Sequence, residues 1–97
     1  MAKDETQELI CELKTLADWQ PKVMEQQVPI ILDCYAEWCG PCKKLEPILT
    51  EKVKALEGRI KMVKLNIDDL PQLSEGLNIR SIPAVFLIYK GNIVDMF

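Results

Sequence analysis

Two cysteines three positions apart, in the segment Trp38-Cys39-Gly40-Pro41-Cys42, constrain this chain more than any other feature. An apolar run over residues 28–35 precedes the segment, and a helical pattern follows it. At such a strand-to-helix junction, two thiols lie close enough to interconvert between dithiol and disulfide, and the helix N-terminus favours the thiolate. The pattern therefore indicates thiol–disulfide redox chemistry rather than a structural crosslink.

The rest of the chain is typical of one small domain. Its 97 residues, 48% of them hydrophobic, can bury a core without help from metals or crosslinks, so we expect a single domain over residues 1–97. Cys34 lies inside the apolar run and Cys11 lies far away, which argues against a disulfide framework. No apolar signal-peptide region is visible, so we expect a reducing compartment. The cytoplasm fits, and so does an organelle after removal of a transit peptide.

Charge, hydropathy and ligand count exclude several classes of function. A net charge of −3 without a basic tract argues against a nucleic-acid partner. No apolar stretch approaches the roughly 18 residues needed to cross a membrane. Half of a zinc site is the alternative for Cys39 and Cys42, but zinc takes about four ligands and the chain has no histidine. We expect no metal and no cofactor other than the Cys39–Cys42 disulfide.

Hydrophobic periodicity predicts strands that alternate with helices. Strands are expected over residues 8–13, 28–36, 59–67, 84–89 and 93–97. Helices are expected over residues 19–26 with Asp18 as the cap, from Pro41 to Gly58, and over residues 70–77 with Asp68 or Asp69 as the start. On the second of these helices, charged residues are assigned to the solvent face: Lys43, Lys44, Glu46, Glu51, Lys52 and Lys54. The alternation predicts an α/β sandwich with a mixed sheet.

The spacing of several motifs resembles that of the thioredoxin family. The motifs are Asp33, residues 36–43, Pro47, residues 64–68, residues 79–83 and Lys90-Gly91. The resemblance covers the chain from about Leu9 to Phe97. It implies a thioredoxin-like fold, with a central mixed sheet flanked by helices, and a reductase of protein disulfides. A thioredoxin reductase-like electron donor would recharge it.

The two cysteines are expected to play different roles. Cys39 precedes the helix, so its sulfur can be exposed to a substrate, and the helix lowers its pKa below the ~8.5 of an ordinary thiol. Cys42, one turn later, is placed to resolve the mixed disulfide. Gly40 lets a partner backbone approach, and Pro41 presets the helical φ.

Asp33 is the candidate for proton transfer. A carboxylate within an apolar run should have a raised pKa, which suits it to exchange a proton with Cys42. The alternative is an edge-strand aspartate with an ordinary solvated carboxylate. The resemblance implies the proton-transfer role, with Lys64 as the nearby charged partner.

Trp38, Ile82 and Pro83 are the candidates for substrate contact. The resemblance implies that the Ile82–Pro83 bond is cis, which would expose the backbone of Ile82 to an extended substrate chain. An ordinary trans proline at the start of a strand is the alternative. Trp38 is interpreted as a shield and contact surface beside the sulfur, against an alternative of simple core packing.

The end of the chain departs from the family pattern. A thioredoxin completes its last strand, passes a glycine and adds a C-terminal helix, whereas this chain stops at Phe97. We therefore expect a C-terminally truncated version of the fold with apolar surface partly uncovered. Three interpretations are open: a domain cut from a longer protein, a chain that associates with another copy to cover this surface, or a chain that is stable without the helix. An alternative function follows, namely a thioredoxin-like binding module of a larger co-chaperone or scaffold protein.

Overall fold

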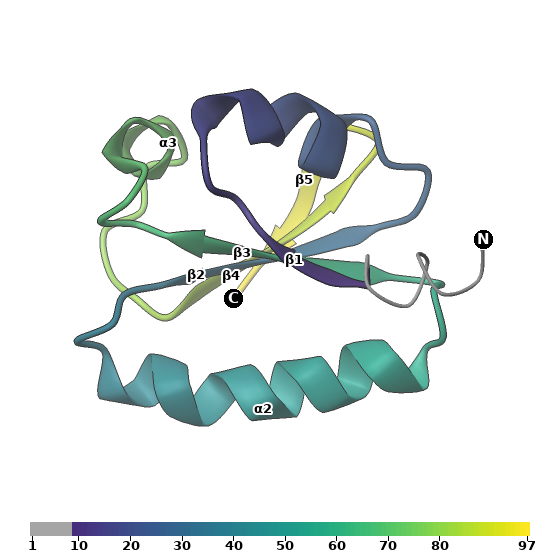
Figure 1. Cartoon of the computed structure of the whole chain (residues 1–97), viewed down its shortest axis with the longest axis horizontal. Helices are drawn as coiled ribbons and strands as arrows, with labels where there is room; N and C mark the ends of the chain where they lie inside the picture. The colour runs from purple at the N-terminus through teal and green to yellow at the C-terminus, as the bar shows by residue number, and fades with distance from the viewer. Residues whose placement is uncertain (1–8) are drawn as a thin grey trace.

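A five-stranded mixed sheet forms the centre of the molecule (Figure 1). The computed structural model describes residues 9–97. The strands are β1 (Ile10–Glu12), β2 (Ile30–Tyr35), β3 (Lys61–Asn66), β4 (Ala84–Tyr89) and β5 (Asn92–Met96). They lie in the order β1-β3-β2-β4-β5, with β1, β3 and β2 parallel and with β4 antiparallel to both β2 and β5. The expected α/β architecture with a mixed sheet is confirmed.

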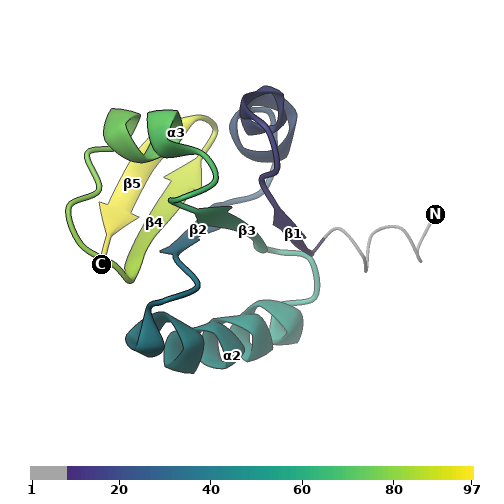
Figure 2. The same ribbon diagram turned by 60° about the vertical axis from the view of Figure 1, so that its left-hand side comes forward.

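Helices cover both faces of the sheet (Figure 2). The long helix α2 (Gly40–Ala55) lies on one face. The other face carries a 3-10 turn, η1 (Leu16–Asp18), a π-helical turn, η2 (Gln20–Met24), and the short helix α3 (Pro71–Gly76). The largest buried apolar cluster lies on this second side, where side chains of β2, β3 and β4 meet Val23 of η2 and the partly buried Leu73 of α3.

Strand β2 is the most enclosed element. It pairs with β3 on one side and with β4 on the other, so its backbone groups are satisfied within the sheet. Leu32 and Cys34 point into the large core, and both have no exposed surface. A strand covered on both faces needs a nearly continuous apolar run, which is what residues 28–36 supply. This strand was therefore correctly predicted, with ends trimmed by one or two residues.

The helix predicted over residues 19–26 is wrong in both form and cap. The segment forms η1 and η2 instead, and the Asp18 carboxylate accepts hydrogen bonds from the backbone N–H groups of Lys14 and Thr15 at 2.8 and 3.1 Å. Asp18 thus reaches back to the preceding turn. Pro21 has no N–H to donate, and the N–H of Glu25 reaches the carbonyl of Gln20 in a wider turn.

Helices α2 and α3 also have boundaries that differ from expectation. Helix α3 starts at Pro71 with Leu70 as its cap, so neither Asp68 nor Asp69 caps it, because proline at the first position already sets the helical φ. Helix α2 ends at Ala55, three residues before Gly58. Glu57 and Gly58 both have positive φ, so the chain leaves the helix there. In the first predicted strand, Glu8 lies outside the described residues.

Strand β5 presents apolar side chains to solvent. The exposed residues at this end of the described chain are Ile93, Val94, Met96 and Phe97. The first three lie on β5, the edge strand of the sheet, which pairs on one side with β4, and Phe97 follows directly after it. The expectation of uncovered apolar surface is confirmed for this strand.

Replacement of Leu32 by alanine tests the role of β2 in the core. The side chain is fully buried, so the substitution removes apolar contacts and leaves a cavity. We expect the free energy of unfolding in urea to fall by about 2–5 kcal/mol. Leu16→Ala is the matched control, because Leu16 is 46% exposed and should lose less than about 1 kcal/mol. Equal losses in the two variants would contradict this assignment of the core.

Candidate active site

Cys39 occupies the N-cap of α2, immediately after the loop that follows β2. Its backbone is extended, and its Sγ accepts a hydrogen bond from the N–H of Cys42 at 3.2 Å. Pro41 lies in the first turn, where the missing N–H costs no helical hydrogen bond. Cys39 and Cys42 form a disulfide across this turn. The backbone donor and the positive end of the helix would both stabilise a thiolate at Cys39 once the bond is reduced.

The two sulfurs are more enclosed than the sequence suggested. Cys39 and Cys42 are each only 4% exposed and pack with Ala36, and Tyr35, Ile67 and Ile82 lie against this small cluster. The expectation of an exposed Cys39 sulfur is wrong for this disulfide form. The bond turns the two Sγ atoms toward each other, and the neighbouring apolar side chains cover the residues.

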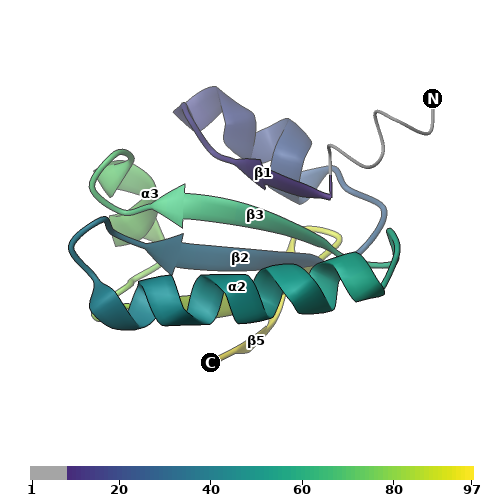
Figure 3. The same cartoon turned by 60° about the horizontal axis from the view of Figure 1, so that its bottom comes forward.

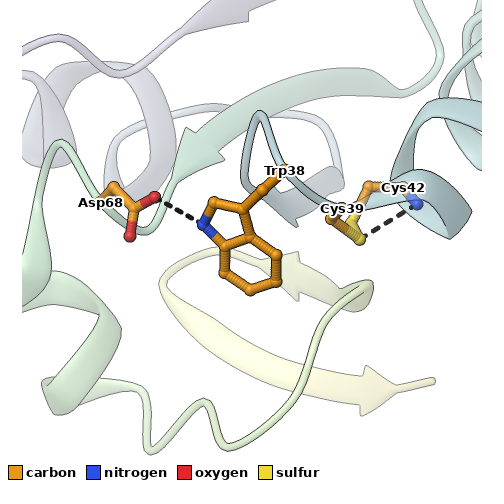
Figure 4. Close-up of a disulfide and its surroundings, with 4 residues drawn as sticks. All are labelled: Trp38, Cys39, Cys42 and Asp68. Atoms are coloured by element: carbon orange, nitrogen blue, oxygen red, sulfur yellow. Dashed lines mark hydrogen bonds between the residues drawn. A yellow bond between two sulfur atoms is a disulfide. The ribbon is translucent and has the colours of Figure 1, made fainter.

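Trp38 lies on the surface beside the disulfide (Figure 4). Its side chain is part of a residue that is 70% exposed, which rules out the core-packing alternative. The indole Nε1–H donates a hydrogen bond of 2.9 Å to the carboxylate of Asp68, in the segment after β3. Figure 4 shows the indole between Asp68 and Cys39. Sequence reasoning did not find this anchor, because Asp68 was assigned to the start of a helix.

The Ile82–Pro83 segment lies next to the cysteines. The bond is cis, as the family resemblance implied, and the trans alternative is wrong. Ile82 packs against the cluster of Ala36, Cys39 and Cys42. A pocket of about 280 Å³ opens beside it, lined by Trp38, Ile67, Ile79, Arg80, Ser81 and Ile82. Two of the lining residues, Ile67 and Ile82, also pack against the cysteine cluster.

Asp33 is buried in the central strand β2, so the edge-strand alternative is wrong. The residue is 2% exposed, and its neighbours in the sheet are Lys64 on β3 and Val85 on β4. Burial raises the pKa of the carboxyl to about 6, helped by the negative charges of Glu46 and Glu12 and opposed by Lys64. The sequence predicted the direction of this shift.

Lys64 makes its direct contact with a residue that the sequence assigned elsewhere. Its Nζ is 2.6 Å from a carboxylate oxygen of Glu46 on α2 and 4.9 Å from the centre of the Tyr35 ring. The Tyr35 hydroxyl in turn donates to the carboxylate of Glu12 on β1. The assignment of Glu46 to the solvent face is therefore incomplete, because its partly exposed carboxylate also binds Lys64. No local pattern could reveal this pair, since its members are 18 positions apart.

The thiol of Cys34 lies apart from the Cys39–Cys42 pair. Cys34 is buried in the large core, where burial first and Asp33 second raise its thiol pKa to about 12. Across residues 9–97, no three side chains of histidine, cysteine, aspartate or glutamate gather as a ligand group for a metal. In the same part of the chain, no helix is both long and apolar enough to span a membrane.

The amino-acid sequence of the chain is similar to those of known proteins. The profile of the family described as Thioredoxin matches residues 11–97. Thioredoxin from Rickettsia felis is 42% identical over 81 residues, which make up 84% of this chain and 77% of that protein. Thioredoxin from Haemophilus influenzae is 41% identical over 78 residues, or 80% of this chain and 73% of that protein. The chloroplastic Thioredoxin M-type from Spinacia oleracea is 40% identical over 86 residues, or 87% of this chain and 48% of that protein.

These matches and the cysteine geometry agree on one chemistry. The matched region spans the Cys39–Cys42 pair, the cis proline and the buried aspartate. The oxidoreductase interpretation is thus confirmed. The chain belongs to the thioredoxin family and is a thiol–disulfide oxidoreductase, a reductase of protein disulfides with a redox-active cysteine pair.

Proposed function

We propose that Cys39 attacks the disulfide of a substrate protein and that Cys42 completes its reduction. The observation that carries this assignment is the position of the Cys39 Sγ at the N-cap of α2, where it accepts the N–H of Cys42. A thiolate there receives a backbone donor and the helix dipole, whereas Cys42 lies inside the first turn. Of the two sulfurs, Cys39 is therefore the better nucleophile.

The electrons and protons of the proposed reaction balance. The Cys39 thiolate forms a bond to one substrate sulfur, and the substrate S–S bond breaks to release the other sulfur as a thiolate that takes up a proton. Cys42 then loses its proton and attacks the Sγ of Cys39, which expels the second substrate thiol. The protein dithiol becomes a disulfide and loses two electrons, and the substrate disulfide gains them. A reductase-like donor would return the pair to the dithiol.

Asp33 is proposed to exchange the proton of Cys42 during the second step. Its pKa of about 6 lies near neutral pH, where a carboxylate can accept a proton and release it again. Leu32 and Cys34 point into the large core, so Asp33 between them points to the opposite face, which α2 covers. Lys64, its neighbour across the sheet, supplies the partly compensating positive charge.

The proposed substrate surface surrounds the disulfide. Trp38 would shield the sulfur on one side, and the backbone of Ile82, ahead of Pro83, would pair with an extended substrate chain. Gly40 lies at the start of α2, and a Cβ there would meet no atom of the chain within 4 Å. Packing within the molecule therefore does not require this glycine. That fits a requirement set by the approach of a partner, with Pro41 fixing the first helical turn.

The proposed partners are protein disulfides and a thioredoxin reductase-like donor, in a reducing compartment. Matched relatives come from bacteria and, by name, from chloroplasts. A reducing cytoplasm would keep Cys11 and Cys34 as thiols while the donor recycles Cys39 and Cys42. An organelle reached through a removed transit peptide would offer the same conditions.

Replacement of Cys39 by serine tests the assignment of the nucleophile. We expect the variant to lose its catalysis of the reduction of insulin disulfides by dithiothreitol, because a serine hydroxyl does not attack a disulfide. Only the slow uncatalysed reaction with dithiothreitol should remain. The rate is followed by the turbidity of precipitating insulin chains. Cys11→Ser is the matched control and should keep the parent rate, since Cys11 lies on β1, away from the cysteine cluster. Equal rates for the Cys39 variant and the parent protein would refute the assignment.

Replacement of Cys42 by serine tests the second step. Cys39 should still attack, but no neighbouring thiol can then release the substrate, so a mixed disulfide accumulates. Mass spectrometry without reductant should find the sum of the protein and one substrate chain. The linkage should map to Cys39. A variant that turns over like the parent, with no trapped adduct, would contradict the role of Cys42.

Replacement of Asp33 by asparagine tests the buried carboxyl. Its pKa rises from about 4 in the unfolded chain to about 6, so between these values the unfolded state loses its proton first and stability falls as pH rises. A shift of two pKa units corresponds to a loss of about 3 kcal/mol in the free energy of unfolding, and this loss is complete above pH 6. For the oxidised protein at pH 7.5, urea unfolding should find Asp33→Asn more stable by about 2–3 kcal/mol.

The same variant should slow the resolution of substrate disulfides at neutral pH, because Cys42 loses its proton acceptor. At pH 4 its stability should match that of the parent protein, since the parent carboxyl is then protonated when folded. A stability gain that is the same at pH 4 and pH 7.5 would show that ionisation is not its cause. An unchanged reductase rate at pH 7 would remove the proton-transfer role.

A further inference from the structure

Glu46 has a position that the proposed reaction does not yet use. It follows Cys42 by four residues on α2, so both side chains lie on the same face of the helix. Its carboxylate accepts a hydrogen bond of 2.6 Å from the ammonium of Lys64, whose side chain is only 18% exposed. The side chain of Glu46 itself is 40% exposed. A short ion pair with one half-buried cation is more than a solvated charge on a helix.

The geometry of the sheet brings this ion pair to Asp33. Lys64 on β3 is in register with Asp33 on β2. Its neighbours Val63 and Leu65 belong to the large core, so Lys64, like Asp33, points to the face that α2 covers. Figure 3 shows α2 running along β2 and β3 on this face. Two acidic side chains, Asp33 and Glu46, thus share one lysine beneath the helix that carries Cys42.

The sharing of Lys64 changes the pKa of Asp33 in a predictable direction. A lysine that pairs with Glu46 neutralises Asp33 less completely than a lysine that pairs with Asp33 alone, and the charge of Glu46 adds repulsion. Glu46 accordingly raises the pKa of Asp33, whereas Lys64 lowers it. Among the described residues, the other charged group that acts on Asp33 is Glu12 of β1, which also raises its pKa. The neighbour on β4 is the apolar Val85.

We propose that Glu46 is a positioning residue, which holds the ammonium of Lys64 and thereby keeps the proton of Asp33 exchangeable with Cys42 near neutral pH. This inference rests on the proposed proton-transfer role of Asp33. Glu46 touches no reacting atom in this scheme. It acts through Lys64, so the ionisation of Asp33 on β2 depends on side chains of β3 and α2 as well as on Glu12 of β1.

Replacement of Glu46 by glutamine tests the proposal with little change of shape. The amide keeps the length of the side chain but removes its charge, so Lys64 is left to compensate Asp33. In the oxidised protein, a carbon-13 NMR titration of the Asp33 carboxyl should find its pKa lowered by about half a unit or more. Lys64→Gln should move the same pKa upward. An unchanged or raised value in Glu46→Gln would overturn the proposal.

A matched variant controls for the loss of a negative charge on the helix. Glu51 is exposed on α2 and takes part in neither of the two ion pairs found among residues 9–97. Glu51→Gln should therefore leave the pKa of Asp33 unchanged. A shift equal to that of Glu46→Gln would mean that general charge, rather than the pair with Lys64, acts on Asp33, and this too would overturn the proposal.

The pH profile of disulfide reduction connects the shift with activity. In Glu46→Gln, the acid limb of the profile should move to lower pH by the amount that NMR finds for Asp33. The combined variant Asp33→Asn, Glu46→Gln should have the profile of Asp33→Asn alone. A further shift in the combined variant would show that Glu46 acts on another group and would refute the proposal. The profile of Asp33→Asn against the parent protein tests the proposed proton transfer separately, so the two failures are distinguishable.

Discussion

The active site depends on the pairing of β2 along both of its edges. Its backbone is hydrogen-bonded to β3 and to β4, and its side chains are covered by α2 on one face and by the large core on the other. The strand leads directly into the loop and the N-cap that carry Cys39. A strand without a free edge has little room to shift its register, because a slip by one residue would turn Leu32 and Cys34 out of the core. The rigid strand therefore restricts the position of the Cys39 sulfur, which follows it in the chain.

The same strand buries Asp33 at a cost in stability. A carboxyl group in the middle of a covered strand loses most of its hydration, and one shared lysine replaces only part of it. The raised pKa is the measure of this incomplete compensation. A better-compensated aspartate would stabilise the fold at neutral pH, but its weaker basicity would suit it less to take a proton from a thiol. The proposed proton transfer therefore favours an incompletely compensated charge.

Near the disulfide, one aromatic side chain is exposed while the two cysteines are buried. Trp38 stands out from the surface and is held by Asp68, while the two cysteines themselves are covered by Ala36 and Ile82. A partner that engages the pocket beside Ile82 would approach across apolar side chains, which exclude water from the region of the exchange. Low hydration strengthens the interaction of a thiolate with the N–H of Cys42 and with the helix end. Enclosure by itself disfavours a charged sulfur, so in a thiolate at Cys39 the N–H of Cys42 and the helix end would have to offset that cost.

The sequence by itself determined the cysteine chemistry, the alternation of strands and helices and the raised pKa of Asp33. Each depends on nearby residues: the spacing of Cys39 and Cys42, the periodicity of apolar positions, and the apolar run around one carboxylate. Local capping at Asp18 was predicted wrongly, because two upstream N–H groups competed for its carboxylate. Only the tertiary structure decided that Glu46 binds Lys64 and that Trp38 binds Asp68. Such pairs join residues 18 and 30 positions apart, and their contact exists only once the sheet brings the elements carrying them together.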